Sequence, residues 1–115
     1  MGIVNKMRPI RPGEILREEF LIPMNLNAHA LAMVLRLPAP RINDIVRERR
    51  GVSADTALRL ARYFGTRAEF WLGLQTDFDL KMAIEVAGKT IEREIELYAL
   101  MTSPVRLASE PSHLR

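Results

Sequence analysis

The chain has 115 residues, of which 48% are hydrophobic and 27% are charged, and its formal net charge is +3. These values are typical of one globular domain with, at most, a short appended element. Because the chain has no cysteine, disulfides and thiolate metal sites are excluded. No apolar run approaches the ~20 residues of a membrane helix, and no secretory leader is recognisable, so we expect a cytoplasmic protein with no membrane partner.

Charge is unevenly distributed along the sequence. Residues 1–65 contain 11 Lys and Arg against 6 Asp and Glu, whereas residues 66–115 contain 6 against 8. A basic half favours contacts with phosphates, although a solvated basic surface has the same composition. The charge distribution is therefore compatible with DNA as a partner and does not decide it.

The first segment, residues 1–11, alternates apolar and basic side chains, and Pro9 and Pro12 prevent a helix from running through it. We predict a flexible lead-in there. A first helix is expected to begin at Pro12 and to be stopped by Pro23 and Asn25. Its predicted buried side is formed by Ile15, Leu16 and Phe20.

Residues 27–47 form the stretch on which the functional prediction depends. Asn27 is expected to cap a short helix, and Pro38 and Pro40 fit only before or within the first turn of a second helix, because proline has no N–H to donate. In that second helix the apolar residues recur at the spacing of a buried face, which leaves polar side chains pointing outward. The apolar residues are Ile42, Ile45 and Val46, and the polar residues are Arg41, Asn43, Asp44 and Arg47. This pattern predicts a helix-turn-helix whose polar second helix fits a DNA major groove.

The rest of the sequence predicts more helices and no strand. Ser53 is expected to cap a helix that ends at Gly65, with the buried residues Ala57, Leu58, Ala61 and Phe64. Residues 66–69 have the pattern of a capping box, and the helix that follows is expected to place Phe70, Trp71 and Leu74 in the core. That helical segment is predicted to continue, with a bend near Gln75, until Gly88.

An all-α fold with a helix-turn-helix domain follows from these elements. We assign this domain to residues 12–87. A further helix over residues 90–101 has enough apolar side chains to require cover from its own domain or from a second chain, so dimerisation is one possible role. Residues 102–115 contain two prolines and no apolar periodicity, and we predict a disordered tail.

The candidate DNA-contacting residues lie on the helix-turn-helix and directly after it. Arg41 and Asp44 are the first candidates for base edges, because arginine can bind guanine through two hydrogen bonds. Asp44 could accept from a cytosine amino group, or it could only orient Arg41 or Arg47. The cluster of Arg47, Arg49 and Arg50 is expected to contact the DNA backbone, although a charge run is more often a solvated face.

The start of the first motif helix is a second candidate region, since such helix N-termini commonly face a phosphate. Asn27 could be only a cap, and a phosphate contact of His29 is no better supported than a solvated side chain. Asn43 either points toward DNA or faces the following helix. The complete candidate set is Asn27, His29, Ala39, Pro40, Arg41, Asn43, Asp44, Arg47, Arg49 and Arg50.

An enzyme is not expected. The chain has only two histidines, and His113 falls in the predicted tail. Glu18 and Glu19 are adjacent on a helix and diverge by about 100°, so they cannot act as a paired acid and base. No glycine-rich phosphate loop or metal-ligand spacing is present, so we predict no cofactor and no metal site.

Several segments resemble the HigA-type antitoxins, a family of the lambda-repressor-like (XRE-type) helix-turn-helix class. They are Pro12–Leu21, Asn43–Val46, Thr56–Thr66, Glu69–Gln75 and Asp77–Leu80, within a resemblance that covers roughly residues 8–85. The resemblance implies a five-helix DNA-binding domain in a bacterial homodimer. It also implies that the protein binds double-stranded operator DNA, represses its own operon, and neutralises a cognate RelE- or HigB-like toxin that cleaves mRNA.

Two alternatives remain open: a stand-alone helix-turn-helix transcriptional regulator, or a protein-interaction module with weakened DNA binding. The second gains weight from a departure from the family, whose turn Asn-Gly-Lys-Arg is replaced here by residues 47–50, Arg-Glu-Arg-Arg. Glu48 resists the left-handed conformation that glycine adopts there. We therefore expect the second motif helix to run at least one residue longer and Gly51 to terminate it. The start of that helix, residues 38–40, is also poor in hydrogen-bond donors.

Overall fold

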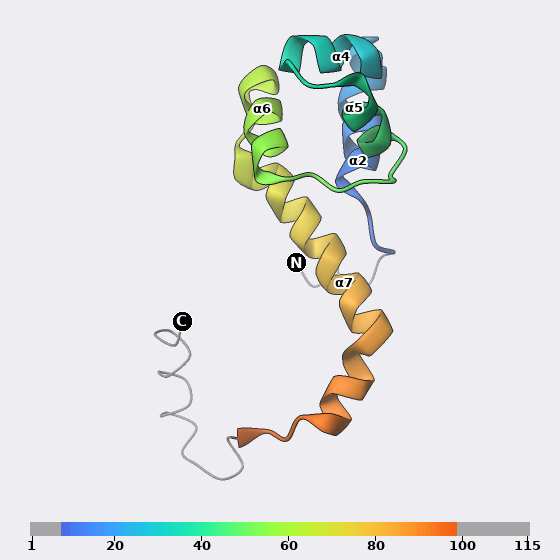
Figure 1. Ribbon diagram of the computed structural model, residues 1–115, viewed down its shortest axis with the longest axis vertical. Helices are drawn as coiled ribbons and strands as arrows, with labels where there is room; N and C mark the ends of the chain where they lie inside the picture. The colour runs from blue at the N-terminus through green and yellow to red at the C-terminus, as the bar shows by residue number, and fades with distance from the viewer. Residues whose placement is uncertain (1–7, 99–115) are drawn as a thin grey trace. The chain divides into compact units, whose positions relative to one another are not determined.

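The computed structural model describes residues 8–98, and within this range every regular element is helical. Three consecutive segments form one N-terminal helix, so residues 8–98 contain five helices. Figure 1 shows their order along the chain, from the N-terminal helix in blue to α7 in yellow and orange. The predicted all-α fold is confirmed. The elements are α2 (Pro12–Ile15), η1 (Leu16–Leu21), α3 (Ile22–Met24), α4 (Ala28–Leu35), α5 (Ala39–Val46), α6 (Ala54–Phe64) and α7 (Ala68–Glu94).

The N-terminal helix changes its hydrogen-bond pattern before Pro23. The segment η1 is a π-helix, and the Ile22 N–H donates to the carbonyl of Arg17, five residues earlier. Such a wide turn relieves the crowding that a proline ring causes inside an α-helix, and Pro23 therefore lies within α3 rather than stopping it. The helix ends at Asn25, as predicted, and this residue adopts a left-handed φ of 54°.

The core joins the N-terminal helix to α4, α5, α6 and the start of α7. Phe20 packs against the rings of Phe64 and Trp71, with centroid distances of 4.7 and 5.1 Å. Gly13 lets the N-terminal helix touch α5, because a Cβ atom at this position would overlap the carbonyl of Ile45. The buried hydrophobic residues are Leu16, Leu21, Leu31, Ala32, Leu35, Ile42, Ile45, Val52, Ala57, Leu60 and Trp71.

The predicted buried face of α6 is wrong at one position. Leu58 is 63% exposed, whereas Leu60 is fully buried together with Ala57 and Thr56. The buried face of α6 is therefore shifted by about one residue toward the N-terminus relative to the face that the apolar pattern suggested. Phe70 was also expected in the core and is 41% exposed, although its ring contacts Trp71 edge-on at 4.9 Å.

Two predicted helix caps are confirmed and one is wrong. The Asn27 side chain accepts from the Ala30 N–H at 2.7 Å, and the Ser53 hydroxyl accepts from the Thr56 N–H at 3.3 Å. The capping box does not form, because α7 begins only at Ala68. The Thr66 hydroxyl instead accepts from the Trp71 indole at 2.8 Å, which satisfies the polar atom of a fully buried ring.

The helix α7 is continuous from Ala68 to Glu94, so the predicted ending at Gly88 is absent. A single glycine costs a helix only about 1 kcal/mol, which neighbouring turns can offset. The chain forms two compact units that divide between Ala83 and Ile84, inside this helix. No helix among residues 8–98 is long and apolar enough to cross a membrane.

Some predictions fall on residues that the structure does not describe. Residues 1–7 of the predicted lead-in, residues 99–101 of the predicted C-terminal helix and the whole predicted tail, residues 102–115, lie outside the described residues. The predicted separate helix over residues 90–101 is wrong over its described part, because residues 90–94 continue α7 and the helix ends at Glu94. The assignment of residues 12–87 and 90–101 to separate functional parts remains a prediction.

Candidate nucleic-acid interface

The turn between α4 and α5 has the geometry that the sequence predicted. Arg36 ends α4 in a left-handed conformation with φ 61°, and the Leu37 N–H closes the helix by donating to the Ala32 carbonyl at 3.0 Å. Pro38 is extended and immediately precedes α5, while Pro40 lies in the first turn. Both prolines thus occupy positions where a missing N–H costs nothing.

The helix α5 has one buried and one solvent-facing side. Ile42 and Ile45 are fully buried, and Val46 is partly buried against the core. The polar candidates and Pro40 have different exposures: Pro40 and Arg47 are exposed, whereas Arg41, Asn43 and Asp44 are partly buried. The candidate Ala39 is partly buried and packs against the core. The predicted division of α5 into a core face and a polar face is therefore present.

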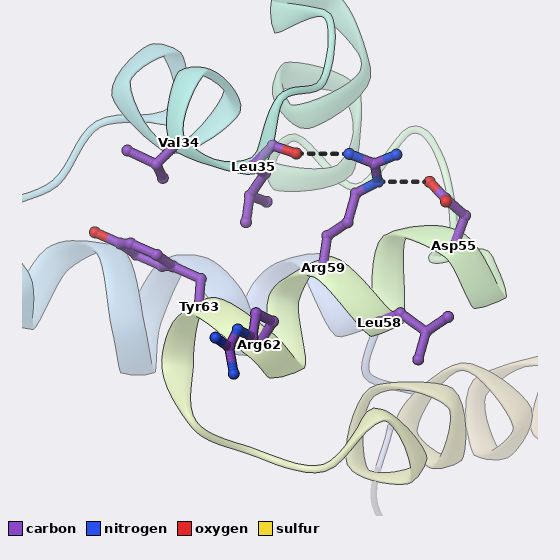
Figure 2. Close-up of a pocket in the computed structure, with 7 residues that line it drawn as sticks. All are labelled: Val34, Leu35, Asp55, Leu58, Arg59, Arg62 and Tyr63. Atoms are coloured by element: carbon purple, nitrogen blue, oxygen red, sulfur yellow. Dashed lines mark hydrogen bonds and ion pairs between the residues drawn. The ribbon is translucent and has the colours of Figure 1, made fainter.

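Arg41 lies beside the start of α6. Its Nη1 atom is 3.8 Å from a carboxylate oxygen of Asp55. The same oxygen of Asp55 accepts from Arg59 at 2.9 Å, and Arg59 also donates to the Leu35 carbonyl at 2.9 Å, as Figure 2 shows. Arg59 thus links the C-terminal end of α4 to α6, and its partner Asp55 lies beside Arg41, which we expect to contact bases.

Asp44 pairs with neither of the arginines that the sequence suggested. Its Oδ1 atom is 3.9 Å from Arg49 Nη1, which places it next to a predicted backbone-contacting residue. Arg50 and Arg41 line the same open hollow of ≈ 450 Å³ at the N-terminus of α6. Members of the two predicted groups, one for bases and one for the backbone, therefore lie close together.

The expected extension of α5 is wrong. The helix ends at Val46, and Glu48 adopts the left-handed conformation with φ 63°. The Glu48 N–H donates to the Ile45 carbonyl at 2.9 Å, and the Arg49 N–H donates to the Asp44 carbonyl at 2.8 Å. These bonds close the helix end as they would with glycine at the left-handed position. We call residues 47–50 the arginine turn.

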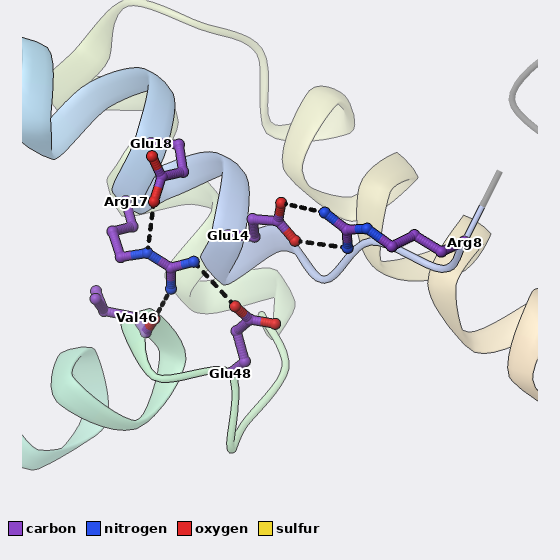
Figure 3. A network of polar contacts seen from close by, with 6 residues as sticks. All are labelled: Arg8, Glu14, Arg17, Glu18, Val46 and Glu48. Atoms are coloured by element: carbon purple, nitrogen blue, oxygen red, sulfur yellow. Dashed lines mark hydrogen bonds and ion pairs between the residues drawn. The ribbon is translucent and has the colours of Figure 1, made fainter.

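Contacts with Arg17 explain why α5 ends at Val46 and why Glu48 adopts the left-handed conformation. Arg17 donates to the Val46 carbonyl at 2.6 Å and to the Glu48 carboxylate at 3.1 Å, as Figure 3 shows. Gly51 does not terminate the helix, but it lies against the end of the Gln75 side chain. A Cβ atom on Gly51 would overlap the side chain of Gln75, which accepts from the Val52 N–H at 2.7 Å.

The remaining candidates lie at the start of α4. Asn27 and His29 are both exposed, and the Asn27 side chain serves as the helix cap. The α5 candidates and the three exposed arginines of the arginine turn lie on contiguous backbone, residues 39–50.

Among residues 8–98, no group of His, Asp and Glu has an arrangement that could hold a metal ion.

Comparison with known proteins assigns the chain to a family, although no family model matches it. Virulence-associated protein I of Dichelobacter nodosus is 65% identical over 79 residues, which cover 69% of this chain and 73% of that protein. The structure of Pseudomonas aeruginosa antitoxin HigA with the higBA promoter is 55% identical, with a TM-score of 0.78, and the match covers 79% of this chain and 99% of that one. The chain belongs to the HigA family of antitoxins.

A further HigA-like structure agrees with this assignment. Antitoxin GraA in complex with its operator is 53% identical, with a TM-score of 0.76, and the match covers 79% of this chain and 92% of that one. The relatives are antitoxins and helix-turn-helix regulators rather than enzymes, as the sequence predicted. The lambda-repressor-like fold and the family resemblance are thereby confirmed.

Sequence analysis missed the side chains that hold this HigA-type helix-turn-helix in place. Arg17, Asp55, Arg59 and Gln75 act through contacts between segments that are distant in sequence, so no local pattern indicates them. Hydrogen bonds to Glu18 and Glu48 raise the pKa of Arg17 above its ordinary value. The guanidinium group of Arg17 is charged at physiological pH with or without this shift.

Proposed function

We propose that this HigA-family chain binds double-stranded operator DNA as a homodimer and represses its own operon. The observation that carries the proposal is α5, whose apolar side is buried while its polar side and the adjoining arginine turn face solvent. Helices in this arrangement enter the major groove. Support also comes from the relatives HigA and GraA, whose structures include promoter or operator DNA.

Within this proposal the candidate residues have different tasks. Arg41 and Asp44 contact base edges, and Asn43, Ala39 and Pro40 lie along the same helix where it faces the groove. The arginines of the arginine turn, Arg47, Arg49 and Arg50, contact phosphates and supply affinity without sequence preference. Asn27 and His29 lie at the N-terminus of α4, where free N–H groups favour a phosphate.

The homodimer is proposed to form through the C-terminal part of α7 and the residues that follow it. Ile84, Ile91 and Ile95 are 60%, 50% and 67% exposed. The spacing of Ile84 and Ile91 places both along one side of α7, and Ile95 follows directly after the last helical residue, Glu94. Such a side is typical of a helix that pairs with a second copy of itself. Such a dimer would present two α5 helices about 34–36 Å apart to a palindromic operator.

Family membership further supports an antitoxin role in the bacterial cytoplasm. We propose that the chain binds and thereby neutralises a cognate RelE- or HigB-like toxin that cleaves mRNA. No residue is assigned to this contact. Co-expression with the product of the neighbouring open reading frame tests it: relief of growth arrest and a stable complex are expected, and neither would be seen for a stand-alone regulator.

Selection from sheared genomic DNA tests the DNA-binding proposal. The purified protein is incubated with the fragments at about 150 mM salt, close to physiological ionic strength, and the bound fragments are sequenced. The proposal predicts enrichment of one palindromic site ahead of the protein's own gene. Enrichment of nothing above random DNA would contradict it and favour a protein-interaction module.

A further inference from the structure

Each side-chain nitrogen atom of Arg17 donates a hydrogen bond, and two of the three connect the N-terminal helix to the end of α5 (Figure 3). Nε donates to Glu18 at 3.0 Å, Nη1 to the Val46 carbonyl at 2.6 Å and Nη2 to Glu48 at 3.1 Å. A guanidinium group is planar and its donors have fixed directions, so bonds at all three nitrogens fix its orientation.

Both partners of Arg17 at the end of α5 need a cation. The Val46 carbonyl belongs to the last residue of the helix, where carbonyls lack intrahelical partners and form the negative end of the helix dipole. Glu48 holds a left-handed backbone that favours glycine, and its carboxylate is tied to Arg17. The side chains of Arg17 and Glu48 are only 32% and 34% exposed, which limits screening by solvent.

The arginine turn is held at both of its ends. At the start, the Arg17 contacts and the bond from the Arg49 N–H to the Asp44 carbonyl fix the reversal of the chain. Just after the end, the Val52 N–H donates to the Gln75 side chain at 2.7 Å. The directions of Arg49 and Arg50, both exposed, therefore depend on a backbone that distant side chains fix.

We propose that Arg17 is a positioning residue for DNA binding. By holding Val46 and Glu48, it fixes the arginine turn so that Arg49 and Arg50 meet phosphates. Arg17 acts through the turn and not by touching DNA. This inference rests on the proposed function, and it adds a residue outside the helix-turn-helix to the determinants of affinity.

A double-mutant cycle on Arg17 and Glu48 tests the proposal, with affinity for the selected operator measured at several salt concentrations. Glu48→Gly is expected to retain affinity, because glycine adopts the left-handed conformation without a bound carboxylate. Arg17→Ala is expected to lower affinity about tenfold. It should also make the salt dependence less steep, because phosphate contacts are lost. In the Glu48→Gly background the same change is expected to cost only about twofold.

Arg8→Ala is the matched control. It removes the same charge from an arginine that binds Glu14 at 2.7 and 3.0 Å, a contact that does not involve the arginine turn. We expect its affinity to stay close to that of the parent protein. An equal loss with Arg8→Ala would show a general charge effect and overturn the proposal. So would equal losses for Arg17→Ala with and without Glu48→Gly, which would show a direct contact of Arg17 with DNA.

Amide hydrogen exchange of the DNA-free protein separates this inference from the proposed function. Arg17→Ala is expected to accelerate exchange of the Arg49 amide and to leave the Leu37 amide, at the end of α4, unchanged. Unchanged exchange at Arg49 would overturn the inference even if the parent protein binds its operator. If the parent protein binds no DNA selectively, the proposed function fails first. Arg17→Lys, which keeps the charge without the planar fork, repeats the cycle if Arg17→Ala does not fold.

Discussion

Chemically similar side chains have opposite environments in α5 and in the segment from residue 84 onward. Ile42 and Ile45 of α5 are completely buried, whereas Ile84 and Ile91 of α7 are 60% and 50% exposed. Burial of one such side chain is worth about 1.5–3 kcal/mol. The chain itself thus fixes the position of α5, and the exposed isoleucines would offer a comparable gain in the proposed dimer. The proposed DNA-contacting helix is therefore preorganised, whereas the C-terminal segment exposes apolar side chains that the proposed dimer would cover.

The substitutions Ile42→Ala and Ile91→Ala are expected to have the largest effects, and the two effects are expected to differ in kind. Ile42→Ala leaves a cavity in the core and is expected to lower the free energy of unfolding by about 4 kcal/mol. Ile91→Ala is expected to weaken subunit association and to leave the unfolding of the dilute monomer nearly unchanged. Urea unfolding over a range of protein concentrations, with sedimentation equilibrium, measures both effects. If both variants lost a similar free energy of unfolding at every protein concentration, the proposed difference would be contradicted.

Substitutions of two glycines test whether α5 requires close contact with the N-terminal helix. Gly13→Ala places a methyl group against the Ile45 carbonyl and is expected to destabilise the protein by about 3 kcal/mol. Gly73→Ala, in α7, meets open space and is expected to stabilise it by about 0.5–1 kcal/mol. Thermal unfolding of both variants tests this. A tolerated alanine at residue 13 would show that α5 can move away from the N-terminal helix.

Substitutions of Arg41 and Arg49 distinguish the proposed base contacts on the polar side of α5 from the proposed phosphate contacts of the arginine turn. Arg41→Ala is expected to reduce discrimination between operator and random DNA by about 2 kcal/mol, because a base contact is lost. Arg49→Ala is expected to weaken binding to both DNAs equally and to lower the salt slope by about one unit. Fluorescence anisotropy with both DNAs provides the measurement. Equal losses on operator and random DNA for both variants would refute the division.

The smallest expected effect concerns the start of α4. Asn27→Ala removes the cap on the Ala30 N–H and is expected to cost about 1 kcal/mol of stability, whereas Asn27→Ser keeps an acceptor and most of that stability. Parallel stability and DNA-binding measurements separate the cap from a phosphate contact. If Asn27→Ser binds DNA as weakly as Asn27→Ala does, the side chain has a task at DNA beyond capping.

The sequence predicted those features that local rules determine. Proline chemistry placed Pro38 and Pro40, hydroxyl and amide side chains indicated the caps at Asn27 and Ser53, and apolar spacing identified Ile42 and Ile45 as buried. The family resemblance supplied the antitoxin assignment, which composition and periodicity alone did not contain.

The errors at Glu48 and in α6 share a different cause, namely contacts between distant segments. The prediction at Glu48 considered only the backbone preference of glutamate, and Arg17, which binds its carboxylate, comes from the N-terminal helix. The buried position of Leu60 in place of Leu58 depends on how α6 rotates against its neighbours. At Pro23, a π-helical segment accommodated a residue that ordinarily stops a helix.

Hydroxyl-radical footprinting on the DNA ahead of the protein's own gene tests the central claim most directly. Two copies of a preorganised α5 are expected to protect two half-sites whose centres lie about 10–10.5 base pairs apart, or a multiple of this spacing. The Ile91→Ala variant should weaken both footprints together. A single protected half-site that is unaffected by Ile91→Ala, or no protection at all, would contradict the account.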